Sequence, residues 1–189
     1  VDLADCKHMI HIYRKTYPMI PVLWTKAANA LSSIAVSQMR GVGKSNTVYT
    51  SDKGFILPNK FVIQYPNLRT IIHPETQRTE MVYDSRKGLE RIYGGKAVEN
   101  IVQGLARCVI AEQMLKMAER YRPVWTVHDA VAIVVPESEK MGAIAFMDQC
   151  MRMVPTWAEG LPLNCEIGFG RTYKDCENKR KYSDILNDG

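Results

Sequence analysis

Apolar residues near the N-terminus recur at the three- and four-residue spacing of an amphipathic helix. One such stretch runs from residue 3 to about 17 and a second from about 20 to 39, with Pro18 between them. The apolar positions are Leu3, Met9, Ile10 and Tyr13 in the first stretch, and Val22, Leu23, Ala27, Ala30, Leu31 and Ile34 in the second. We therefore predict two consecutive helices within a helical segment that covers residues 1–40.

The pattern changes to short alternating runs between residues 47 and 83. Runs such as 46–49, 61–65 and 68–73 are separated by Asp-Lys-Gly, Pro-Asn and Tyr-Pro-Asn, which are turn sequences. The spacing predicts a β-rich segment, residues 41–92, placed between two helical parts.

Helical spacing returns after Gly94 and Gly95, and it predicts a long helix from about residue 96 to 121. The expected buried stripe consists of Val98, Ile101, Val102, Leu105 and Val109. The opposite side carries Lys96, Asn100, Gln103 and Arg107. Lys and Arg neutralise phosphates, while Asn and Gln hydrogen-bond base edges, including minor-groove acceptors. A solvated helix face has the same composition, so the stripe alone leaves both interpretations open.

Two short β-branched runs, 124–127 and 131–135, follow this helix and are bounded by proline on both outer sides. Only His128, Asp129 and Ala130 separate them, which predicts a tight hairpin with an acid on its turn. A carboxylate held between two strands suits a divalent cation, which needs a charged oxygen ligand in a fixed position. A solvated turn of an ordinary hairpin is the competing interpretation.

The remainder of the chain predicts one more helix and one more strand. Ser138 is the expected N-cap of a helix that runs to about Met153. Residues 161–169 read as a strand ended by glycines, and the polar residues from Asp175 onward are expected to be loose.

Composition adds an uneven distribution of charge to this picture. With 189 residues and 46% hydrophobic content, the chain is expected to form one globular domain or a large piece of one. Residues 40–96 hold ten basic and five acidic side chains, whereas the rest of the chain holds fifteen of each. The whole net charge of +5 therefore lies in one segment, as expected for a surface that faces a polyanion, although plain solvated surfaces also carry such an excess.

Cysteine usage and the N-terminus favour a reducing, cytoplasmic setting. The five cysteines are widely spread and contain no Cys-x-x-Cys, so neither a disulfide framework nor a thiolate zinc site is indicated. No run approaches the roughly 18 apolar residues of a membrane span, and no basic-then-apolar signal segment opens the sequence.

Two other motifs carry no function in our interpretation. Cys6, His8 and His11 do not share one helix face, so we do not expect them to bind a metal. Residues 41–45, Gly-Val-Gly-Lys-Ser, lack the first glycine of a phosphate-binding loop, because Gln38 stands there. We expect a basic loop with glycines at this place.

Taken together, the motifs resemble the C-terminal part of family A DNA polymerases, the superfamily of bacterial DNA polymerase I, and most closely its phage members. The matching stretches occur in order over about residues 10–175. They are Tyr-Arg-Lys-Thr-Tyr-Pro at 13–18 (the stretch after the fingers helix), 57–68 (a phage-type insertion) and 93–103 (the minor-groove helix). Thr-Val-His-Asp-Ala-Val at 126–131 with Pro-Glu-Ser-Glu at 136–139 resembles motif C and the helix after it, and 161–173 resembles the last palm strand and closing turn.

The resemblance implies an α+β fold. Its parts would be an antiparallel palm sheet with packed long helices, a small β-rich insertion, and N-terminal helices from the fingers–palm junction. Residues 93–175 would be the palm portion and 176–189 a polar tail. Motif A and motif B of the family are absent from the sequence, and Ala130 replaces the usual glutamate of motif C. We therefore expect a fragment of a DNA-dependent DNA polymerase that is inactive alone.

The resemblance also implies roles for particular residues. Family members transfer nucleotides with two Mg²⁺ ions about 3.5 to 4 Å apart, bridged by two aspartates, of which Asp129 matches one. His128 would contact the primer terminus and Gln103 the minor-groove acceptors near it. The expected duplex-lining residues are Lys96, Asn100 and Arg107, with Arg91 as a further phosphate contact. DNA primer-template and deoxynucleoside triphosphate would be partners of the full-length enzyme, and the missing polymerase portion or a processivity factor is a candidate partner.

Two other classes of protein stay open at this stage. A metal-dependent phosphohydrolase would use the pair His128 and Asp129, but it needs more histidines than the four present. A non-catalytic nucleic-acid-binding module would bind DNA in a salt-dependent way, and replacing Asp129 with alanine would slightly strengthen that binding.

Overall fold

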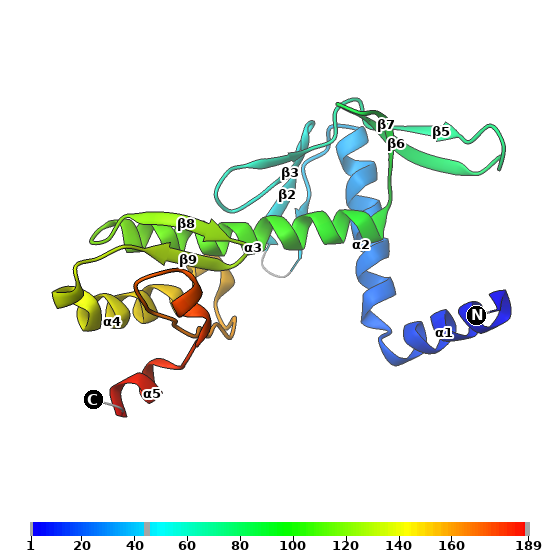
Figure 1. Cartoon of the computed structure of the whole chain (residues 1–189). Helices are drawn as coiled ribbons and strands as arrows, with labels where there is room; N and C mark the ends of the chain where they lie inside the picture. Colours follow the sequence, from blue (N-terminus) through cyan, green and yellow to red (C-terminus); the bar gives the residue numbers. More distant parts are fainter. Residues whose placement is uncertain (1, 44–45, 188–189) are drawn as a thin grey trace. The chain divides into compact units, whose positions relative to one another are not determined.

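The computed structural model describes residues 2–43 and 46–187, and it is a mixed α+β fold with antiparallel sheets, as the sequence predicted (Figure 1). The chain folds as two compact units, Val1–Leu105 and Ala106–Gly189. The long helix α3 (Gly94–Ala118) begins in the first unit and ends in the second. Among the described residues, no helix is long and apolar enough to cross a membrane.

The first unit begins with two helices, α1 (Leu3–Thr16) and α2 (Met19–Ala35). No residue of α1 is buried, and in α2 only the second half packs inward, through Ala27, Ala30, Leu31, Ser33 and Ile34. The prediction that α2 continues to residue 39 is wrong. Ser37 adopts a left-handed φ of 55°, and the N–H groups of residues 37 and 38 donate to the carbonyls of residues 34 and 33. This is a Schellman ending, formed without the glycine that usually marks it in a sequence.

The β-rich part of the first unit consists of two antiparallel sheets. The four-stranded sheet has the order β1 (Gly41–Val42), β2 (Val48–Thr50), β3 (Gly54–Ile56) and β4 (Val62–Gln64), and the three-stranded sheet has the order β5 (Arg69–Ile72), β6 (Thr79–Ser85) and β7 (Gly88–Ile92). The fully buried side chains of Val48, Thr50 and Phe55 form the inner face of the four-stranded sheet. In the predicted basic loop at 41–45, Lys44 and Ser45 lie outside the described residues.

The buried side of α3 differs from the predicted stripe. The residues buried along the helix are Ala97, Ile101, Cys108, Val109, Ile110, Gln113 and Met117, whereas Val102 is 57% exposed. In the first unit the helix is held by small residues. A Cβ at Gly104 would lie only 2.8 Å from a methyl carbon of Leu57, so this glycine faces the four-stranded sheet. Ala97 and Gly104 therefore widen the buried side beyond the predicted stripe, of which Ile101 and Val109 are buried and Val102 is not.

The second unit contains the predicted hairpin, β8 (Pro123–Val127) and β9 (Ala130–Ile133), followed by a 3₁₀ turn at Glu137–Glu139 and α4 (Lys140–Met151). Ser138 lies inside the 3₁₀ turn, so it is not the N-cap that the sequence suggested. The buried amide of Gln113 donates to the carbonyl oxygen of Met151 at 2.7 Å, which attaches α3 to the end of α4.

Two predictions for the C-terminal part are wrong. Residues 161–169 do not form a strand; only Ile167 pairs, in a single bridge with Arg180. Residues 175–187 are folded rather than loose, because they include a 3₁₀ turn at Lys174–Glu177 and the short helix α5 (Tyr182–Asn187). Ile185 of α5 is buried with Ile144 and Ile167, and this cluster attaches the tail to α4.

Candidate functional site

The turn between β8 and β9 consists of His128 and Asp129. Val127 pairs with Ala130, so only these two residues connect the strands. His128 has a φ of 53°, in the left-handed region. Residues other than glycine are uncommon in this region, but histidine is enriched among those that occur there. Two-residue connections of this kind fix the register of both strands and therefore the position of their side chains.

Both turn residues are exposed. Asp129 forms no hydrogen bond or salt bridge with any described residue, so all its carboxylate oxygen lone pairs are free for a ligand. Across the described ranges, no group of three or more His, Cys, Asp or Glu side chains is arranged to hold a metal ion. The carboxylate of Asp129 is therefore accessible to a ligand, but among the described residues it lacks the companions that a Mg²⁺ site requires.

Aromatic packing supports the hairpin from the C-terminal segment. The rings of Trp125 and Tyr173 lie 4.7 Å apart at 49° to one another. With Val127 and the β9 residues Ala130, Val131 and Ala132, they line a small hollow next to the turn. Tyr173, at the end of the segment that resembles the last palm strand and closing turn, thus packs against the hairpin that carries the candidate acid.

The polar stripe of α3 within the first unit consists of Lys96, Asn100 and Gln103. The ammonium group of Lys96 lies 3.1 Å from Glu99, and the Gln103 amide donates to the same carboxylate at 3.3 Å. The side chain of Lys96 is 46% exposed and Gln103 is also exposed. Contacts with one exposed glutamate are weak and easily exchanged, so both side chains are free to bind an external partner.

Asn100 has a different environment from its two neighbours. It is half-buried, and its amide donates to the hydroxyl of Tyr65 at 2.9 Å. Tyr65 is only 2% exposed, and its ring packs edge-on against Phe55 of β3 and Tyr83 of β6. Burial raises the pKa of the Tyr65 hydroxyl, while the bond from Asn100 acts in the opposite direction. Asn100 therefore links α3 to both sheets of the first unit.

We expect Tyr65→Phe to lower the free energy of unfolding of the chain by about 1 kcal/mol, because one part-buried hydrogen bond is lost while the ring packing stays. Urea unfolding followed by circular dichroism measures this change. Tyr49→Phe is the matched control, since Tyr49 is 42% exposed and its hydroxyl has no bond to a described residue. Equal stability of the two variants would contradict a structural role for the bond.

The two candidate arginines lie in different units. Arg91 on β7 pairs with Glu80 at 3.1 Å, and its guanidinium lies 5.7 Å from the centre of the Tyr93 ring. Arg107 belongs to the second unit, together with His128 and Asp129, and its side chain is exposed. Arg91 is thus already partnered on the sheet, whereas Arg107 is open to solvent.

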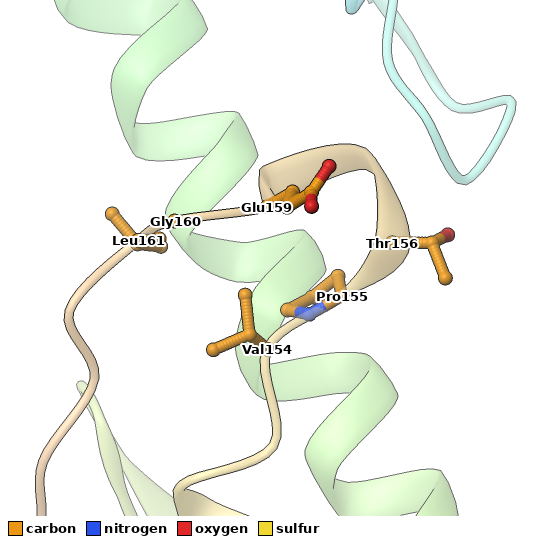
Figure 2. A pocket seen from close by; sticks show the side chains of 6 residues that line it. All are labelled: Val154, Pro155, Thr156, Glu159, Gly160 and Leu161. Atoms are coloured by element: carbon orange, nitrogen blue, oxygen red, sulfur yellow. The ribbon is translucent and has the colours of Figure 1, made fainter.

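A further hollow lies on the loop after α4 (Figure 2). It is lined by Val154, Pro155, Thr156, Glu159, Gly160 and Leu161. Glu159 is the one charged group in this lining, and no histidine, cysteine, lysine or second carboxylate accompanies it. This hollow therefore has no assigned chemistry.

Tyr65 could not be recognised from the sequence as the partner of Asn100. The two residues lie 35 positions apart, and neither hydrophobic spacing nor turn chemistry connects them. A buried tyrosine needs a partner for its hydroxyl, but only the folded chain shows which residue supplies it.

Comparison with known proteins gives one match for part of the chain. No family model matches, and no solved structure matches. The chain is 40% identical over 86 residues to a DNA polymerase of Bacillus phage SP02, and this stretch covers 43% of the chain and 12% of that polymerase. The match thus covers only a small part of the length of the phage polymerase. Over the 86 matched residues, the chain is related to a phage DNA polymerase.

Proposed function

We propose that this chain is a C-terminal portion of a phage-type, family A DNA-dependent DNA polymerase, contributing one catalytic aspartate and part of the primer-template surface. The observation that carries the proposal is the exposed Asp129, which has no bond to a described residue and stands on the two-residue turn of the β8–β9 hairpin. The partial match to a phage DNA polymerase supports the same enzyme class.

Within this proposal the residues divide into two tasks. Asp129 supplies one oxygen ligand to the catalytic cations, and His128 beside it contacts the primer terminus. The exposed side chains of Lys96, Gln103 and Arg107 bind the primer-template. The charged groups of Lys96 and Arg107 contact phosphates, and the amide of Gln103 hydrogen-bonds minor-groove acceptors. The buried contact of Asn100 with Tyr65 favours a supporting role for Asn100 in this surface.

Magnesium chemistry requires more than these residues provide. When bound, Mg²⁺ would supply positive charge that stabilises the negative charge developing during nucleotidyl transfer. Asp129 alone does not fit such a site, because one carboxylate rarely holds Mg²⁺ against water and no described group of acids completes it. The proposal therefore assigns the second acid to a part of the polymerase outside this sequence.

Primer extension by these 189 residues tests the proposal directly. We expect no extension by the chain alone, and extension of the same primer by a longer polymerase that contains it, since only the longer protein has both acids. Incorporation of a labelled nucleotide into a primed template is the measurement. Robust synthesis by the chain alone would refute the assignment of the second acid to a missing part.

A further inference from the structure

The excess positive charge of the first unit is concentrated on turns rather than on the sheet faces. Four of its acids are engaged by other side chains: Glu80 pairs with Arg91, Asp84 with Arg69 and Glu99 with Lys96, and Glu90 accepts hydrogen bonds from two hydroxyls. The turns between strands carry five basic side chains, all exposed: Lys53, Lys60, Arg78, Arg86 and Lys87. Of these turns, the one between β6 and β7 carries two adjacent cations.

This β6–β7 turn is short and well defined. Ser85 pairs with Gly88, so Arg86 and Lys87 alone make the connection. The N–H of Lys87 donates to the Ser85 hydroxyl at 3.0 Å, and Gly88 takes a φ of 111°, which favours glycine. Within residues 2–43 and 46–187, neither cation forms an ion pair. Two free charges are thus held at the tip of a rigid hairpin.

Glu90 connects this tip to the beginning of α3. Its two carboxylate oxygens accept hydrogen bonds from Ser85 and Tyr83, each at 2.8 Å, and these bonds, the Ser85 bond first, lower its pKa. Glu90 lies on β7, the five-residue strand that leads from this turn to the first turn of α3. Lys87 and Lys96 therefore lie near the two ends of one strand, and their charges also lower the pKa of Glu90.

We propose that Arg86, Lys87 and Lys96 form a binding surface for the phosphate backbone of duplex DNA, with the β6–β7 turn as an element that the family resemblance does not assign. The inference deepens the proposed polymerase function, because it extends the DNA surface of α3 onto the β-rich segment. Two acids accompany these three cations, Glu90 on β7 and Glu99, which pairs with Lys96, so the surface keeps one net positive charge.

The chemistry of the turn favours the backbone of a duplex over the bases of a single strand. Single-strand binding relies on aromatic side chains on which bases stack. The turn residues 85–88 include no aromatic side chain, and the nearby ring of Tyr93 lies under the guanidinium of Arg91. Point charges on a stiff tip suit phosphate oxygens, which require no base-specific geometry.

Salt-dependent binding of a fluorescent duplex by the 189-residue chain tests this proposal. Each phosphate contact contributes about 0.9 to the slope of log K against log salt, so Arg86→Gln with Lys87→Gln should lower that slope by about 2. Between about 50 and 200 mM salt, the unmodified chain should then lose about tenfold more affinity than the double variant. Fluorescence anisotropy gives both affinities, and circular dichroism confirms that the variant is folded.

Two further variants make the result specific. Lys60→Gln with Arg78→Gln removes the same charge from two other turns of the same unit and should leave the slope unchanged. Glu90→Gln removes an anion beside the proposed surface and should raise duplex affinity by about twofold. The proposal would be overturned if both double variants had equal slopes, or if Glu90→Gln bound duplex more weakly. It would also be overturned if the chain bound single strands more tightly than duplex, or did not bind duplex at all. Because no polymerisation is measured, these outcomes are independent of whether Asp129 is catalytic.

Discussion

Replacing Asp129 with alanine in the complete polymerase should reduce primer extension by at least about 10³-fold, because a cation that stabilises transition-state charge by several kcal/mol loses one of its ligands. Asp129 is exposed and has no bond to a described residue, so its removal should leave the free energy of unfolding unchanged. Single-turnover extension of a primed template at saturating nucleotide measures the loss. Duplex affinity, measured by anisotropy, should change little.

The control for this variant is Glu137→Ala on the 3₁₀ turn that follows the hairpin. Glu137 is also an exposed acid, with a side chain 80% exposed and a long contact of 3.4 Å to Arg171. Its replacement removes the same charge from the same unit and should leave extension near that of the unmodified enzyme. Retained extension by Asp129→Ala would refute the ligand role. Retained extension together with slightly tighter DNA binding would instead favour a non-catalytic nucleic-acid-binding module.

The hairpin that carries Asp129 could be predicted from the sequence because its signals are local. Proline bounds both runs, the runs are β-branched, and the short polar connection permits only a tight turn. The structure confirms both strands, although β8 begins one residue earlier than expected. Ala130 belongs to β9 rather than to the turn, and β9 ends at Ile133, two residues before the predicted end at Val135. The exposure of the acid follows from this turn, since neither turn residue has a strand neighbour.

The orientation of α3 could not be predicted in the same way, because it depends on contacts between segments distant in sequence. Hydrophobic spacing placed the buried stripe on the large residues and included Val102. The helix instead packs through Ala97 and Gly104, which contribute little to a hydrophobic pattern but allow a sheet to approach closely. The same cause explains the missing strand at 161–169. Gly168 and Gly170 pack against the chain near Cys176 and Asp175, and this contact replaces a strand partner.

Gly94→Ala should destabilise the first unit by about 3 kcal/mol or more, because the added methyl group meets backbone rather than a movable side chain. A Cβ at Gly94 would lie 1.9 Å from the carbonyl oxygen of Trp24 and 3.2 Å from the nitrogen of Ala28, both in α2. Helices α2 and α3 must separate to accept it. The measurement is urea unfolding of the chain, with the unfolding midpoint and the slope determined separately.

Gly95→Ala is the matched control, one residue further along the same helix. A Cβ there would lie 3.2 Å from the Tyr93 ring, a side chain that can shift, and alanine favours a helix over glycine by about 1 kcal/mol. We therefore expect the stability of this variant to stay within about 1 kcal/mol of the original chain. Equal losses for both variants would show that the helix start is merely sensitive to substitution. A loss confined to Gly94→Ala, accompanied by weaker duplex binding, would show that close contact with α2 sets the position of Lys96 on the DNA surface.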